Sequence, residues 1–178
     1  MRPQLDLTSV PSWAVEPTCP PADLSGRDHT VLAIGADAVT IAQRWADEIS
    51  AYRAGTHPRV HRVSDATAAC AVLDAELADA VVGWRLLLAG PAHECLRVRA
   101  HALAHGVADD EITVASTEVG IREVYCAHCR TVTTAGVGLS ETVPCAGCGR
   151  ELFVYYHVSR RLGAHLGFAT AASYRGTQ

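Results

Sequence analysis

Apolar and polar residues alternate in blocks that predict strands and helices between residues 29 and 117. Short apolar runs closed by Gly, Pro or Asp are typical of buried parallel strands. They cover residues 30–34, 84–89 and 112–114, and the mixed segment 59–63 predicts a further strand. Stretches with apolar side chains at helical spacing lie between them, at 38–52, 66–80 and 92–105. Strand–helix–strand units with short links predict a fold of class α/β, a small parallel-sheet three-layer domain.

The chain divides into three parts by this pattern. Residues 1–28 hold five of the eight prolines and predict an irregular arm, because proline removes a backbone donor and blocks helix. Residues 29–117 form the α/β domain, and residues 118–178 form a smaller module and tail. Within that module, strands are expected at 121–125 and 152–158, a loop at 131–144, and a short helix or lid at 159–167.

Trp13 is the one large aromatic residue in the arm, and it has two interpretations. It could pack back onto the domain's own surface, or it could anchor the arm on a partner protein. The sequence does not choose between them.

Two Cys-x-x-Cys motifs dominate the C-terminal module. Cys126 and Cys129 form the first pair, Cys145 and Cys148 form the second, and fifteen residues separate the pairs. Two tight turns at this spacing can present four thiolates to one ion in a tetrahedral shell. The sequence therefore predicts one metal ion bound by four sulfurs, in a zinc-ribbon or rubredoxin-like module, rather than two disulfides.

Zinc and iron both accept four thiolates, so the ligand set leaves the metal open. Gly149 after the second pair suits either metal, whereas Arg130 stands where a second rubredoxin-like turn would have glycine. Structural Zn²⁺ is the favoured interpretation, with a redox iron as the alternative. His128, inside the first motif, is not needed as a ligand and is expected to be exposed.

Composition excludes several classes of protein. The formal net charge is −4 and the arginines are dispersed, which argues against a nucleic-acid partner. No apolar run is long enough to span a membrane, and the first ten residues lack a signal-peptide core. Free thiols beside a thiolate site fit a reducing compartment, so a cytoplasmic location is expected.

The loops after the predicted strands are the place where a parallel sheet binds ligands. Gly90-Pro91 and residues 106–112 resemble the closing part of the nicotinamide domain of ferredoxin reductases. That family has a glycine-rich first loop for pyrophosphate, but here the loop after Gly35 carries Asp37, whose charge would repel phosphate. Gly35 and Gly90 are thus weak cofactor-binding candidates in a degenerate, reductase-like domain.

Several segments together resemble the family of small A subunits of bacterial dimethylamine monooxygenases. They are residues 89–91, 125–129, 145–149 and 157–164, the last containing Ser-Arg-Arg-Leu-Gly-Ala. The resemblance implies a multicomponent enzyme that converts dimethylamine to methylamine and formaldehyde with NADPH and O₂. It further implies that the haem, the flavin and the iron–sulfur cluster are carried by partner subunits, namely an oxygenase and a reductase.

The role expected for this chain is structural docking or electron relay. No nucleophile–base pair, HExxH motif or complete phosphate loop is present, so no catalytic residue is expected here. Arg160 and Arg161 are weak candidates for docking the large subunit through carboxylates, and a solvated tail is the alternative. His101 and His105, one helical turn apart, could hold a metal, although a solvated helix face is the favoured interpretation.

Two other functions remain open at this stage. A free-standing zinc ribbon could bind nucleic acid or a protein partner, and an NAD(P)-linked reductase fragment would bind nicotinamide.

Overall fold

Four strands form a parallel sheet in the order β2-β1-β3-β4 in the computed structural model, which describes residues 7–52 and 55–169. These strands are β1 (Asp28–Ile34), β2 (Arg59–Val63), β3 (Trp84–Gly90) and β4 (Ile112–Ser116). The central strands β1 and β3 are almost wholly buried, as their unbroken apolar runs require. The predicted parallel-sheet α/β fold is confirmed.

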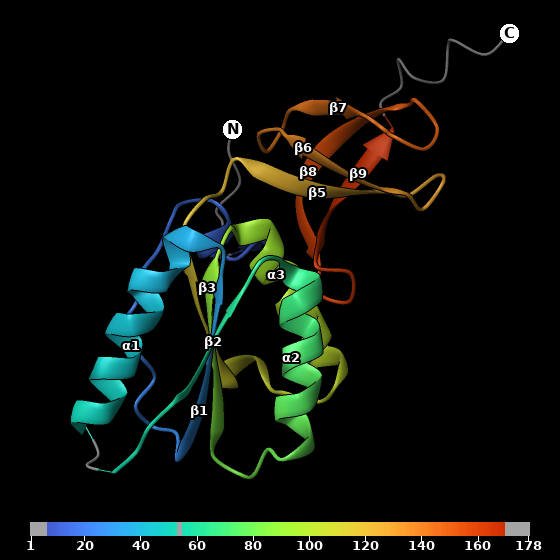
Figure 1. The fold of residues 1–178 in the computed structure, drawn as a ribbon. Helices are drawn as coiled ribbons and strands as arrows, with labels where there is room; N and C mark the ends of the chain where they lie inside the picture. The colour runs from blue at the N-terminus through green and yellow to red at the C-terminus, as the bar shows by residue number, and fades with distance from the viewer. Residues whose placement is uncertain (1–6, 53–54, 170–178) are drawn as a thin grey trace, which may run out of the picture.

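Helices cover both faces of this sheet (Figure 1). They are α1 (Val39–Tyr52), α2 (Ala66–Ala78) and α3 (Ala92–Ala104). Trp45 and Ile49 of α1 pack on one face, and Leu73 of α2 and Val98 of α3 pack on the other. Among the described residues, the helices are all too short or too polar to cross a membrane.

A second sheet of five strands carries the cysteines, in the order β6-β5-β9-β8-β7. The strands are β5 (Ile121–Cys126), β6 (Val132–Gly136), β7 (Thr142–Pro144), β8 (Glu151–Ser159) and β9 (Ala164–Ala169). Two predictions are corrected here. The expected loop at 131–144 contains β6 and β7, and the tail expected as a short helix or lid forms β9. Strand β9 pairs in parallel with β5 and antiparallel with β8, so it is the central strand of this sheet.

The second sheet lies beyond the carboxyl ends of the parallel strands (Figure 1). Ala92 and Leu96 of α3 share a buried cluster with Val158 of β8. The turn between β8 and β9 approaches α3 so closely that a Cβ on Gly163 would lie 2.5 Å from the carbonyl oxygen of Leu96. The division of the chain at residues 28 and 117 remains a prediction.

The proline-rich arm runs along both sheets. Ser9 accepts a hydrogen bond from the N–H of Val158 at 2.9 Å, and Thr18 accepts one from the N–H of Ser116 at 3.0 Å. Trp13, in the short 3₁₀ turn η2 (Ser12–Ala14), is half-buried against apolar clusters of this same chain. The structure thus shows Trp13 in the first of its two expected roles. Residues 1–6 of the predicted arm and 170–178 of the predicted tail lie outside the described residues.

Candidate metal centre

Each Cys-x-x-Cys motif forms the turn between two antiparallel strands, the first between β5 and β6 and the second between β7 and β8. In the first turn the N–H of Cys126 donates to the carbonyl of Thr131, and the carbonyl of Cys126 accepts from the N–H of Arg130, both at 2.9 Å. The second turn repeats both bonds at 2.9 Å through Cys145, Arg150 and Gly149. The two motifs therefore have the same backbone geometry, as their shared spacing predicts.

The two turns bring the four sulfur atoms together. All four Sγ atoms lie within 4.8 Å of one another, with Cys126–Cys148 at 3.9 Å and Cys129–Cys145 at 3.5 Å. A tetrahedron with metal–sulfur bonds of about 2.3 Å has sulfur–sulfur edges of about 3.8 Å. A disulfide would need a separation of about 2.05 Å, and all seven cysteines are free. The donor set therefore fits one tetrahedral metal ion.

Local hydrogen bonds favour thiolates at two of these sulfurs. The hydroxyl and backbone N–H of Thr131 lower the pKa of Cys129 to about 6. Burial raises the pKa of Cys145, but N–H groups of Cys148 and Gly147 outweigh it and leave the pKa lowered. Four thiolates this close repel one another, so full ionisation requires a cation among them.

Three residues that the sequence did not single out support the sulfur cluster. Thr133 accepts a hydrogen bond from the N–H of Ala146 at 3.0 Å, which joins the second turn to β6. A Cβ on Gly147 would lie 2.9 Å from the Cβ of Thr131 and 3.1 Å from the Sγ of Cys129. Gly147 is therefore required for the close approach of the two turns. The sequence signal for the role of Thr131 was its position, two residues after the first Cys-x-x-Cys motif.

Left-handed backbone ends both turns. Gly149 has φ 70°, which glycine adopts without strain, and Arg130 has φ 66°, which is strained for a residue with a Cβ. The structure thus explains why the sequence places glycine in one turn, and it shows that arginine takes the same conformation in the other. His128 is exposed, as expected.

The two candidate cofactor-binding glycines lie at the carboxyl ends of β1 and β3. Gly35 has φ 79° and donates its N–H to the carbonyl of Val63 at 2.9 Å, so the turn itself requires glycine. A Cβ on Gly90 would lie 2.8 Å from the Cβ of Ile34, so packing of neighbouring strands accounts for this glycine. Both glycines have structural explanations, and cofactor binding at them remains a prediction.

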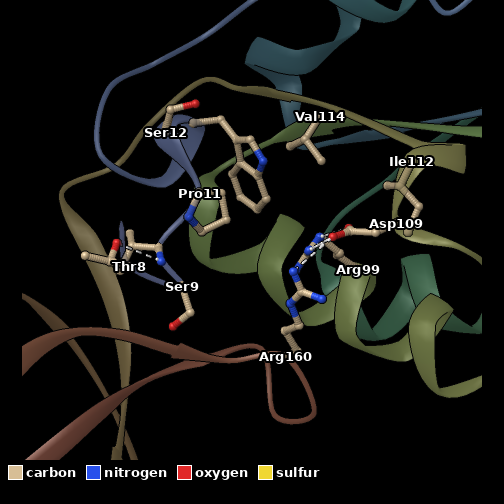
Figure 2. A pocket seen from close by; sticks show the side chains of 11 residues that line it. Thr8, Ser9, Pro11, Ser12, Arg99, Asp109, Ile112, Val114 and Arg160 are labelled. Atoms are coloured by element: carbon tan, nitrogen blue, oxygen red, sulfur yellow. Dashed lines mark hydrogen bonds and ion pairs between the residues drawn. The ribbon is translucent and has the colours of Figure 1, made fainter. Parts of the chain in front are cut away.

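The two candidate docking arginines lie in the turn between β8 and β9. Figure 2 shows Arg160 pointing toward an ion pair in which the buried Arg99 contacts the exposed Asp109 at 2.6 and 2.8 Å. Arg160 lies 3.5 Å from the same carboxylate and remains 69% exposed, beside an open cavity of about 400 Å³. Arg161 is also exposed. The structure therefore engages Arg160 internally, whereas Arg161 forms no ion pair with another residue of the described ranges.

The comparisons with known proteins agree with this arrangement. A family model described as "Dimethylamine monooxygenase subunit DmmA-like, C-terminal domain" matches residues 123–168, which contain all four cysteines. The chain is 34% identical, over 96% of its length and 94% of the relative, to a protein of Ectopseudomonas mendocina (strain ymp). That relative is named "Heme-dependent oxidative N-demethylase delta subunit". No solved structure matches the chain.

Proposed function

The chain belongs to the family of DmmA-like small subunits, and from this membership we propose that it is the metal-binding, non-catalytic subunit of a multicomponent haem-dependent amine monooxygenase. The proposed overall reaction is oxidative N-demethylation of dimethylamine, which yields methylamine and formaldehyde and consumes NADPH and O₂. A haem-bearing oxygenase subunit and a flavin and iron–sulfur reductase subunit are the proposed partners, in the cytoplasm.

The observation that carries the proposed role is the sulfur cluster. Cys126, Cys129, Cys145 and Cys148 are the proposed ligands, and zinc is the proposed metal. Bound zinc would supply no redox chemistry, only a rigid link between the β5–β6 and β7–β8 hairpins. The buried cluster around Val124, Leu152 and Val154 is small, so this sheet depends on the metal for stability. If the ion were iron, the same four sulfurs would make a one-electron centre and the role would be electron relay.

A docking role is supported by the outer face of the β8–β9 hairpin. Tyr155 and Phe168 are exposed and Phe153 is half-buried beside them, with ring centroids 6.1 to 6.2 Å apart around Tyr155. Aromatic side chains and arginine are enriched at the centres of protein interfaces. We propose that this face and Arg161 contact the haem-bearing subunit, with Arg160 as a weaker contributor because Asp109 already engages it.

Metal content and absorption spectrum of the purified chain test the site. We expect a colourless protein with about one zinc ion per chain, whereas a red ferric tetrathiolate spectrum would assign electron relay instead. Replacement Cys145→Ser should remove the metal and make the β5–β9 sheet sensitive to protease, with the β1–β4 sheet intact. A metal-free wild-type chain would contradict the proposed site.

Co-purification with the proposed partner subunits tests the docking face. We expect Tyr155→Ala with Phe168→Ala to abolish co-purification, and Arg161→Ala to weaken it. Val82→Ala is the control, because Val82 is also an exposed apolar residue but lies between α2 and β3. Unchanged co-purification of the aromatic variants, with zinc still bound, would reject this docking face.

A further inference from the structure

Helices α2 and α3 lie side by side on one face of the parallel sheet and bring three ligand-type side chains together (Figure 1). Asp74 comes from α2, while His101 and His105 come from the last turn of α3 and its C-cap. One oxygen or nitrogen atom from each residue lies within 4.8 Å of the others. None of the three belongs to the second sheet or to the four-cysteine cluster.

We propose that Asp74, His101 and His105 form a second metal site, which binds a divalent transition-metal ion at the protein surface. Two imidazoles and one carboxylate are a ligand set that suits zinc, copper or nickel. The remaining coordination positions would be open to water, because all three side chains are partly exposed. The site thus differs from the four-cysteine cluster both in its ligands and in its access to solvent.

The hydrogen bonds of His105 orient it as a ligand. Its Nδ1 lies 2.9 Å from the backbone carbonyl oxygen of His101. A carbonyl oxygen can only accept, so Nδ1 carries the proton and the Nε2 of the neutral ring carries a lone pair. That Nε2 lies 3.9 Å from the Oδ1 of Asp74. An N–H to backbone carbonyl bond that fixes the tautomer is the usual support of a metal-bound histidine.

The atoms that face one another favour a shared cation. The Nε2 of His101 lies 2.5 Å from the same Oδ1 of Asp74, and the two imidazole rings are 4.3 Å apart. The Nε2 lone pair of His105 and the carboxylate oxygen are both acceptors, so a proton can satisfy only the His101 contact. A metal ion at about 2.0 to 2.2 Å from each ligand would satisfy all three at once. Ligand separations would then be about 3 to 3.5 Å, which requires only rotation of exposed side chains.

The competing explanation is a simple hydrogen-bonded ion pair that joins the two helices. In that case Asp74 and His101 would be sufficient, and His105 would contribute nothing to the contact. The two explanations differ in the number of metal ions that the chain binds and in the dependence of that number on His105.

Zinc titration of the full chain, without a histidine tag and already loaded with one zinc ion, tests the proposal. We expect calorimetry to show a second zinc equivalent, lost in His105→Ala and in Asp74→Asn, while both variants retain the first. His57→Ala removes an exposed histidine elsewhere and should keep both equivalents. In NMR spectra, the imidazole C–H signals of His101 and His105 should shift upon addition of the second equivalent, and that of His57 should not.

Three results would overturn the second site. They are saturation at one equivalent in the wild type, retention of the second equivalent in Asp74→Asn, or equal loss in His57→Ala. Circular dichroism of each variant separates loss of the ligand from loss of the fold. If His105→Ala disturbs the end of α3, the Asp74→Asn variant alone tests the second site, because this substitution keeps the shape of the side chain and removes its charge.

Discussion

Replacement of Gly147 by alanine should weaken the four-cysteine centre without changing any ligand. The added Cβ would lie 2.9 Å from the Cβ of Thr131 and 3.1 Å from the Sγ of Cys129. Rotation of the Thr131 side chain moves its hydroxyl but leaves its Cβ in place. The two turns must therefore separate, and the thiolate of Cys129 moves out of the position in which it can bind the metal with the other three sulfurs.

The magnitude follows from the cost of overpacking a tight contact, about 1 to 3 kcal/mol. Because about 1.4 kcal/mol is a tenfold change in an equilibrium constant, zinc affinity should fall roughly 5- to 140-fold if the whole cost falls on the metal-bound state. The same substitution leaves the backbone dihedrals allowed, since Gly147 does not have a positive φ. The predicted effect is therefore steric.

Competition with a chromophoric zinc chelator measures the affinity, and thermal unfolding of the zinc-loaded chain measures the stability. Gly136→Ala is the matched control, because a Cβ there meets nothing within 4 Å and Gly136 lies in the neighbouring strand β6. We expect the control to bind zinc as the wild type does. Equal affinities for Gly147→Ala and Gly136→Ala would refute the role assigned to close packing of the two turns.

Two further substitutions test other parts of the fold. Gly163→Ala should destabilise the contact between the two sheets by roughly 2 to 5 kcal/mol, because alanine would have to adopt left-handed backbone (φ 65°) and its Cβ would clash with Leu96. A rate of limited proteolysis unchanged from the wild type would contradict this. Burial, with a smaller contribution from Arg122, lowers the pKa of His165 to about 4, so stability present above pH 6.5 is lost as the pH falls toward 4. His165→Leu should reduce the loss of stability between pH 7 and pH 5 by about 2 kcal/mol in urea unfolding, whereas His57→Ala should leave the loss as it is.

The α/β part of the fold could be predicted from sequence because its signals are local. The central strands β1 and β3 contain apolar runs, and each helix has an apolar face or a cap, such as Asp65, which accepts the N–H of Ala68 at 2.9 Å. The four cysteines could be predicted as one site because each Cys-x-x-Cys spacing predicts a tight turn with two thiols, and two such turns supply a tetrahedral ligand set. These features do not depend on which distant segment becomes the neighbour.

The second sheet was harder because its strands are defined by their partners. Strand β9 contains Gly167, which reads as a helix or strand breaker in sequence. In the structure a Cβ on Gly167 would lie 2.6 Å from Val124 and 3.1 Å from Leu152, so glycine permits tight packing inside the sheet. Strands β6 and β7 are short, both contain threonine, and they are stabilised by pairing with β5 and β8.

The candidate metal site on α2 and α3 could likewise be predicted from sequence only in part. His101 and His105 are four residues apart and were visible as a pair. Asp74 lies 27 residues before His101, and only helix packing brings its carboxylate to the two rings. An exposed aspartate on a helix carries no signal of its own in a single sequence.

The course of the arm has a consequence for how the protein matures during synthesis. Ser9 precedes both sheets in the chain, yet the backbone N–H that it binds belongs to Val158, 149 residues later. The parallel sheet can form while translation continues, and η2 can then pack on α3 and β4, but the bond from Val158 to Ser9 must wait until β8 has emerged. A nascent chain stalled before β8 would therefore lack Val158, and the apolar cluster of Val10, Ala14, Ala92 and Leu96 would stay open on that side to chaperones and proteases.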